Sequence, residues 1–263
     1  MIQFNIKRFG KLAVWSLTND RSFYTKQALT MLAVTMFIFV VSTTGFFQVS
    51  SMSEHGASQA YQTCTIATVA AFLITIITGP SWMFSSMKGR HDLQTLLMLP
   101  ASNFEKLLMR YATWFILLPL YIAAFFVADL TQYLVNVLLG NDYMMFVAQK
   151  VCDIFTAEAY LPTRLWLSVF VAGLWLHSWY TLGGTLFRSH KYAWILTTIA
   201  LIVLLMIQMS IFTYSDYQEA KNDVTTTDYA IMDSITLAWT MLNFWLSYRL
   251  FCRQQVIGKF INW

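Results

Sequence analysis

Six stretches of this chain carry no charged side chain apart from one histidine, and they limit the possible folds more than any other feature. They cover residues 28–48, 59–87, 111–128, 165–187, 192–215 and 234–248. A helix needs about 20 residues to cross a hydrocarbon core about 30 Å thick, and most of the stretches are long enough to do so. The sixth is short, but the flanking Asp233 and Arg249 can reach the membrane interface.

These stretches predict an all-α integral membrane protein with a single transmembrane domain over residues 1–263. We expect six transmembrane helices at residues 28–48, 62–86, 107–128, 164–186, 192–213 and 233–252. Hydrophobic residues make up 57% of the chain and charged residues 11%, against about 25% charged in soluble domains, so no independent soluble domain is expected. The first stretch starts too late and is too long for a cleaved signal peptide, and we expect it to remain in the mature protein.

Lysine and arginine lie almost entirely on one side of the expected spans. When the connecting segments are assigned to alternating sides, 14 of the 17 basic residues share a side, and only Lys150, Arg164 and Lys221 fall on the other. The positive-inside rule then predicts a multi-pass membrane protein with both termini in the cytoplasm. Ten of the 13 acids fall on the outer side, and this polarity argues against nucleic acid as a partner.

The segment before the first span has a helical pattern. Residues 5–18 place Ile6 and Phe9 on one face and Lys7 and Lys11 toward the other. This pattern predicts an interfacial amphipathic helix, with its apolar face in the membrane lipids and its cations near anionic headgroups. The alternative is an unstructured basic tail.

The expected outer side carries further structure after the third span. That helix should continue past its apolar stretch to Leu139, because Gly140 and Asn141 form a stop signal. Residues 143–160 then predict a small helical cap on the outer face. Residues 216–233 are acidic and polar, and they predict a solvated, flexible loop.

The three cysteines, Cys64, Cys152 and Cys252, show no metal-ligand or redox spacing. Cys64 and Cys152 can both lie near the outer face. Two interpretations stay open for them, a disulfide and separate packing as small apolar side chains.

The segment between the second and third spans contains a short helix that is set off by breaks. Gly89 interrupts the incoming helix, and Pro100 stops the helix expected at residues 92–99. Ser102 and Glu105 form a capping box, which predicts that the third helix begins before the membrane, in the cytoplasm, at Asn103.

This short helix has an apolar side. Leu93, Leu96 and Leu97 share it, beside the basic residues Lys88 and Arg90. A helix with exposed leucines and basic flanks suits insertion into a groove on a soluble partner. The alternative is a connector that lies on the lipid surface.

The order of elements and the residues after the short helix resemble the membrane subunit of type-2 ABC exporters. Residues 96–108, Leu-Leu-Met-Leu-Pro-Ala-Ser-Asn-Phe-Glu-Lys-Leu-Leu, are similar to the "LP-x-S-x-x-E-K" segment of bacterial permeases of this class. The resemblance implies that residues 90–99 form the coupling helix, which docks on an ATP-binding subunit. The docking residues would be Arg90, His91, Asp92, Leu93, Leu96 and Leu97.

The same resemblance implies the partners and the function. ATP and Mg would be bound by the separate ATP-binding subunit, and this chain itself would hold no cofactor. A second permease subunit would complete a homodimer or a heterodimer among the membrane lipids, and the resemblance to bacterial permeases implies the bacterial cytoplasmic (inner) membrane. Residues 216–233 depart from the family, whose members often have apolar re-entrant helices in this position.

Motifs of the common catalytic sites are absent from the sequence. Without a Gly-x-x-x-x-Gly-Lys-Ser/Thr phosphate loop this chain cannot supply an ordinary ATPase site, and His-Glu-x-x-His and Gly-x-Ser-x-Gly are missing as well. We therefore expect no enzyme but a permease that exports an unidentified substrate with energy from the ATPase. The alternatives are a substrate-capture subunit of an importer and, less well supported, an intramembrane enzyme that uses His177.

Four polar residues within the spans are candidates for lining a transport pathway. Thr68 and Thr75 belong to a stripe on the second span, and His177 and Asn243 lie in the fourth and sixth spans. Each has a structural alternative, because threonines also bond their own backbone and polar side chains also join neighbouring helices.

The charge distribution yields a test of the topology. Cysteines introduced as Ser53→Cys and Asn222→Cys should react with an impermeant thiol reagent added outside sealed cells, whereas Ser189→Cys should not. Labelling at position 189 would reverse the orientation.

Overall fold

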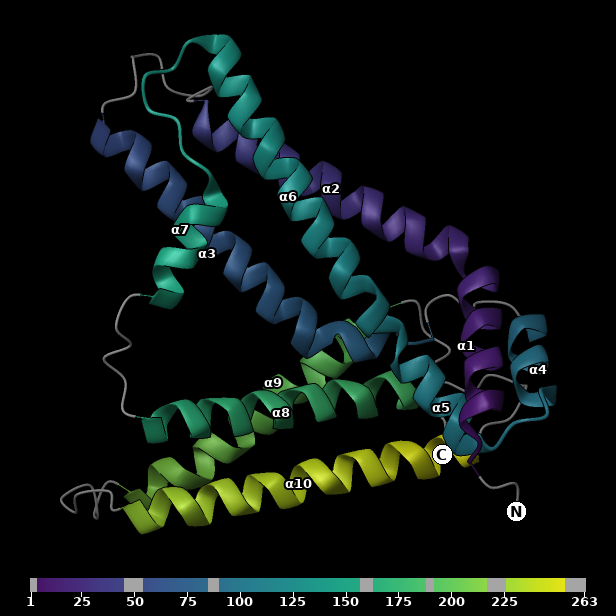
Figure 1. The fold of residues 1–263 in the computed structure, drawn as a ribbon. Coiled ribbons are helices and arrows are strands. Elements are labelled where there is room, and N and C mark those ends of the chain that lie inside the picture. The colour runs from purple at the N-terminus through teal and green to yellow at the C-terminus, as the bar shows by residue number, and fades with distance from the viewer. Residues whose placement is uncertain are drawn as a thin grey trace. The chain divides into compact units, whose positions relative to one another are not determined.

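The structure is a computed structural model, and its described residues are 4–44, 54–84, 90–156, 163–187, 192–216 and 226–253. Every regular element in these ranges is helical, as the sequence predicts (Figure 1). The elements are α1 (Ile6–Asn19), α2 (Arg21–Thr43), α3 (Glu54–Thr78), the 3-10 turn η1 (Gly79–Trp82), α4 (Arg90–Met98), α5 (Asn103–Tyr111), α6 (Thr113–Leu139), α7 (Val147–Thr156), α8 (Thr163–Leu186), α9 (Ala193–Asp216) and α10 (Thr226–Cys252).

Within the described residues, four helical segments are long and apolar enough to cross a membrane. They are Arg21–Thr43, Gly56–Trp82, Asn103–Leu139 and Leu165–Leu186. The chain is therefore a multi-pass membrane protein. The expected fifth and sixth spans fall on α9 and α10, which are not among these four; the apolar part of α9, Ala193–Gln208, is shorter.

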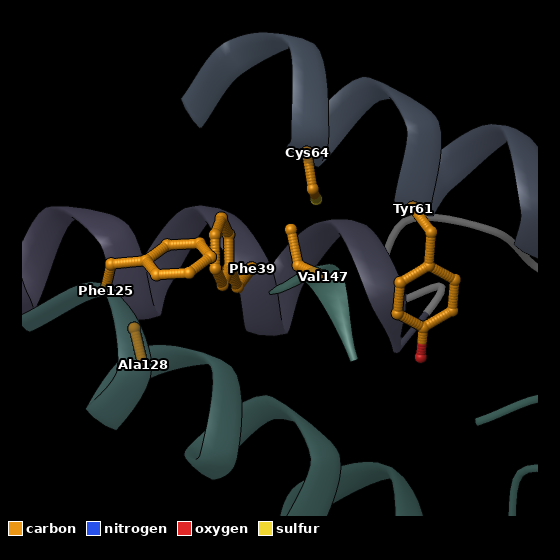
Figure 2. Packing of buried hydrophobic residues seen from close by; sticks show 6 residues of the cluster. All are labelled: Phe39, Tyr61, Cys64, Phe125, Ala128 and Val147. Atoms are coloured by element: carbon orange, nitrogen blue, oxygen red, sulfur yellow. The ribbon is translucent and has the colours of Figure 1, made fainter. Parts of the chain in front are cut away.

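The chain divides into two compact units, and unit 2 comprises Trp15–Thr75 and Thr113–Tyr160. Two buried clusters join its long helices. One contains Phe39, Tyr61, Cys64, Phe125, Ala128 and Val147 (Figure 2), and the other contains Tyr24, Leu117 and Tyr121 with Phe72 packed against them. From the second cluster to the first, residue numbers rise along α2 and α6 but fall along α3. Within unit 2, α2 and α6 therefore run in the same direction and α3 runs opposite to both.

Cys64 lies in the first of these clusters with 1% of its surface exposed, whereas Cys152 is exposed on α7. No disulfide joins the two sulfur atoms in the described part of the chain. For Cys64, packing as a small apolar side chain is the interpretation that agrees with the structure.

Unit 1 comprises Met1–Val14, Ile76–Ala112 and Leu161–Trp263. Here α8 and α10 lie side by side (Figure 1) and are joined at two well-separated levels, by Ser168 with Asp233 and by Thr185 with Ser247. Because residue numbers rise together along both helices, the two helices are parallel. Near the start of α9, the Thr197 carbonyl oxygen accepts a hydrogen bond from Trp179 Nε1 in the second half of α8.

Several helices begin or end at other residues than expected, and two of these differences are informative. The third apolar helix continues as α6 to Leu139, where a Schellman motif ends it: Gly140, with φ 69°, donates to the Val137 carbonyl and Asn141 donates to the Asn136 carbonyl. The helix of the first expected span is α2, which begins at Arg21 instead of residue 28 because polar residues before the apolar stretch continue the helical pattern.

Two other expected elements differ in extent. Of the cap expected over residues 143–160, the described part contains helix α7 at Val147–Thr156, and residues 157–160 lie outside the described ranges. Part of the loop expected over residues 216–233 is helical, since α9 reaches Asp216 and α10 begins at Thr226. Residues 217–225 lie outside the described ranges.

A glycine on α8 allows a close backbone contact that can be tested. A Cβ atom on Gly184 would lie 2.8 Å from the Pro80 carbonyl oxygen and 2.9 Å from the Ser81 Cα, whereas Gly173 on the same helix has open space. Gly184→Ala should therefore destabilise the protein by about 1–3 kcal/mol, and Gly173→Ala should not. Thermal unfolding of the detergent-solubilised protein measures the difference, and equal melting temperatures would contradict the contact.

Candidate functional site

The segment from α4 to α5, within unit 1, forms the candidate site. The helix α4 ends at Met98 before Pro100, and α5 begins at Asn103, as expected. The capping box is present, because the Glu105 backbone N–H donates to Ser102 Oγ over 3.2 Å and the Ser102 backbone N–H donates to Glu105 Oε2 over 2.8 Å. The sequence therefore predicts the start of α5 correctly.

The Glu105 side chain also binds the beginning of the chain. Its carboxylate is 0% exposed and accepts bonds from Arg8 Nε at 2.9 Å, Arg8 Nη2 at 2.6 Å and the Asn5 backbone N–H at 2.7 Å. Such a two-pronged guanidinium–carboxylate pair fixes orientation as well as distance. The hydrogen bond to Glu105 raises the pKa of Arg8 above its ordinary value, so that this side chain stays charged. The first turn of α1 is thereby fixed to the start of α5.

Lys106 fixes α4 from the other side. Its Nζ donates to the Leu97 carbonyl oxygen over 2.7 Å, and this bond satisfies one of the carbonyl groups left open at the end of α4. Each polar residue of the Leu-Pro-Ala-Ser-Asn-Phe-Glu-Lys run with a described contact thus serves the local structure: Ser102 and Glu105 begin α5, and Lys106 ends α4. The run holds two short helices in a fixed geometry.

The expectation that Leu96 is exposed on α4 is wrong. Leu96 is 0% exposed and Leu97 is half-buried, while Met98 is 83% exposed. A helix of nine residues is not stable alone in water, so part of its apolar side has to pack on the chain. Arg90, His91, Asp92 and Leu93 lie on α4, and their side chains are outside the described part of the structure.

The threonine candidates on α3 bond their own helix. Thr68 donates to the Cys64 carbonyl oxygen over 2.8 Å, and Thr75 donates to the Ala71 carbonyl oxygen over 2.7 Å. Both side chains are half-buried. These bonds satisfy the hydroxyl donors within apolar surroundings, and the contacts agree with the structural interpretation of the stripe.

His177 joins three elements of unit 1 and is 7% exposed. Its Nδ1 lies 2.7 Å from the Ile76 carbonyl oxygen, and its Nε2 lies 2.5 Å from the Tyr111 hydroxyl. A carbonyl only accepts, so in the neutral imidazole Nδ1 carries the proton and Nε2 accepts from Tyr111. Both ring nitrogens are occupied by these bonds, which gives His177 a structural role between α8 and α5.

Asn243 is likewise used between helices. It is 2% exposed, and its Nδ2 donates to Ser178 Oγ over 3.0 Å. One level further on, Thr185 Oγ1 lies 3.2 Å from Ser247 Oγ. Together with the bond between Ser168 and Asp233, these contacts form a series of polar pairs along α8 and α10, as polar side chains do between helices in lipid.

Comparison with known proteins adds no further assignment. The chain matches no family model, no curated protein and no solved structure. The resemblance of residues 96–108 to type-2 ABC permeases therefore stays an expectation, and the contacts within the chain carry the functional argument.

Sequence reasoning finds the local contacts of this site and misses the distant ones. The capping box is visible as Ser102 followed three residues later by Glu105. The partners Asn5 and Arg8 lie about a hundred residues away, and no spacing rule links them to Glu105. The bond between Tyr111 and His177 has the same character.

The clamp between Arg8 and Glu105 can be tested by exchange of backbone hydrogens. Glu105→Gln removes the negative charge that holds Arg8, so amide hydrogens at the start of α1 should exchange several-fold faster, as measured by mass spectrometry. Arg8→Gln should do the same, and the double variant should add little because both changes break one interaction.

Asp142→Asn, which changes an exposed acid elsewhere in the chain, is the matched control and should leave this exchange unchanged. Unaltered protection of α1 in Glu105→Gln would show that the carboxylate does not fix the helix.

Proposed function

We propose that this chain is the membrane subunit of an ATP-driven exporter of the ABC type, and that a separate ATP-binding subunit docks on α4. The observation that carries the proposal is the rigid seating of this helix. Lys106 fixes its last turn, the capping box begins α5 immediately after it, and Met98 at its end is left 83% exposed. A short helix held firmly at its base with an apolar end exposed suits a groove on a soluble partner.

The surface of α10 supports a six-span topology. Its polar residues Asn243 and Ser247 are 2% and 1% exposed, whereas Met241 and Trp245 are 71% and 53% exposed. A helix in water shows the opposite distribution, and a helix that faces lipid on one side and protein on the other shows this one. The sixth span expected from the sequence is therefore retained in the proposal.

The directions of the helices within each unit support the same topology. In unit 2, the alternation of α2, α3 and α6 fits three successive crossings. In unit 1, α8 and α10 are parallel, so the chain between them has to return, and α9 with 24 residues is about 36 Å long. With six crossings both termini would lie on the same side, and the charge distribution favours the cytoplasmic side. The bacterial inner membrane is proposed from the resemblance to bacterial permeases.

Contacts within unit 1 connect α4 to the span α8, so that a movement of α4 can be transmitted to this span. Lys106 connects α4 to α5, and Tyr111 at the end of α5 contacts His177 on α8. We infer that binding and hydrolysis of ATP in the partner subunit move α4 and α5 together, because the polar run leaves little freedom between them. His177 then acts as a positioning residue and not as a catalytic one.

The proposal includes further components that the chain does not supply. ATP and Mg bind to the partner ATPase, and a second permease subunit, identical or related, completes the transporter among the membrane lipids. The substrate is left unassigned. Because Leu96 is buried, we assign the docking contacts to the exposed part of α4, which includes Met98 at its C-terminal end. The resemblance adds Arg90, His91, Asp92, Leu93 and Leu97 as proposed contacts.

A crosslinking experiment tests the docking. A photoreactive amino acid in place of Met98 should crosslink, in native membranes, to a polypeptide that contains a phosphate loop and binds ATP. Met98→Asp should lower recovery of this ATPase by at least about tenfold, because a charge would be buried without a partner, while Met98→Leu should retain it.

Leu96→Asp serves as the contrasting variant. It should lower the amount of folded membrane protein, since Leu96 packs within the chain. Normal recovery of the ATPase with Met98→Asp would remove α4 as the docking element.

A further inference from the structure

The first turn of helix α7 is buried against the long helices of unit 2. Val147, its first residue, is 0% exposed and lies in the cluster with Phe39 of α2, Cys64 of α3 and Phe125 of α6, as Figure 2 shows. Ala148 and Val151 pack against the same cluster less completely. One side chain of α7 thus fills a position where three long helices meet.

A buried carboxylate from another helix holds this first turn. Asp129 of α6 is 2% exposed, and its Oδ1 accepts from the Val147 backbone N–H over 2.8 Å while its Oδ2 accepts from the Ala148 backbone N–H over 3.0 Å. The first N–H groups of a helix have no partner within the helix, and negative charge is favourable there. Asp129 therefore caps α7 from outside its own sequence.

Met145, two residues before the helix, is also held by hydrogen bonds. The Met145 backbone N–H donates to the Tyr61 hydroxyl over 3.3 Å, and its carbonyl oxygen accepts from Gln132 Nε2 over 3.0 Å. The same Gln132 nitrogen donates to Asp129 Oδ1 over 3.0 Å. Further along α7, Cys152 and Asp153 are exposed. Asp129 and its neighbours Gln132 and Tyr61 therefore hold the start of α7 and the residues before it.

We propose that α7 is a latched cap on unit 2, that Asp129 is the latch, and that release of the cap exposes an apolar surface containing Cys64. When the carboxylate is lost, two N–H groups of a buried helix end have no acceptor. Their exposure to water then has a lower free energy than their burial. The surface uncovered in that state comprises Phe39, Tyr61, Cys64 and Phe125. This inference goes beyond the proposed transport function and does not depend on it.

The thiol of Cys64 reports on the cap directly. In a Cys152→Ser/Cys252→Ser background Cys64 is the single cysteine, and in the closed state a small thiol reagent should modify it slowly. Asp129→Ala should raise the modification rate by about tenfold or more, because both bonds to α7 are lost. Asp129→Asn keeps the volume and one acceptor oxygen, and its rate should fall between the two.

Leu117 provides the control for general loosening of unit 2. It is 4% exposed and belongs to the other buried cluster of the same helices, away from α7. Leu117→Cys in a Cys64→Ser/Cys152→Ser/Cys252→Ser background should react slowly with or without Asp129→Ala. Faster modification of position 64 alone supports the latch, whereas equal acceleration at both positions, or acceleration at neither, overturns it.

Discussion

The buried carboxylate of Glu105 is the contact on which the segment between α3 and α6 depends. It accepts from the backbone of Asn5 and Ser102 and from two nitrogens of Arg8, so a single side chain begins α5 and holds α1. A buried acid is costly unless it is paired and hydrogen-bonded, and here it is both. Because these bonds involve one 0% exposed group, movement of any one element has to move the others or break several bonds.

Asp129 uses the same chemistry in unit 2. Both acids accept backbone N–H groups at the start of a short helix, and both come from residues that the short helix does not contain. Helices as short as α1 and α7 are marginal in isolation and depend on contacts with the rest of the chain. Hydrogen bonds from an acid on a neighbouring helix supply such contacts, with the difference that Glu105 has a cationic partner and Asp129 is bonded by backbone and amide groups.

The contacts of α8 and α10 show why the polar residues within the spans are structural in character. Lipid offers no hydrogen bonds, so the hydroxyl and amide groups of Ser178, Asn243 and Ser247 turn toward the neighbouring helix or its backbone. The same rule orients His177 between a carbonyl and a tyrosine hydroxyl. The described hydrogen bonds of the pathway candidates therefore agree with the structural alternative for each of them, namely Thr68, Thr75, His177 and Asn243.

Features that depend on neighbouring residues were determined by the sequence itself. Runs without charge predict the long helices, Gly140 ends α6, and the spacing of Ser102 and Glu105 begins α5, because helix formation and capping act over three to five residues. The tertiary structure alone decided that Leu96 is buried, that Arg8 pairs with Glu105 and that Asp129 caps α7. The bonds of Arg8 and Asp129 join residues 97 and 18 positions apart. A periodic pattern shows which side of a helix is apolar but not which neighbour will cover it.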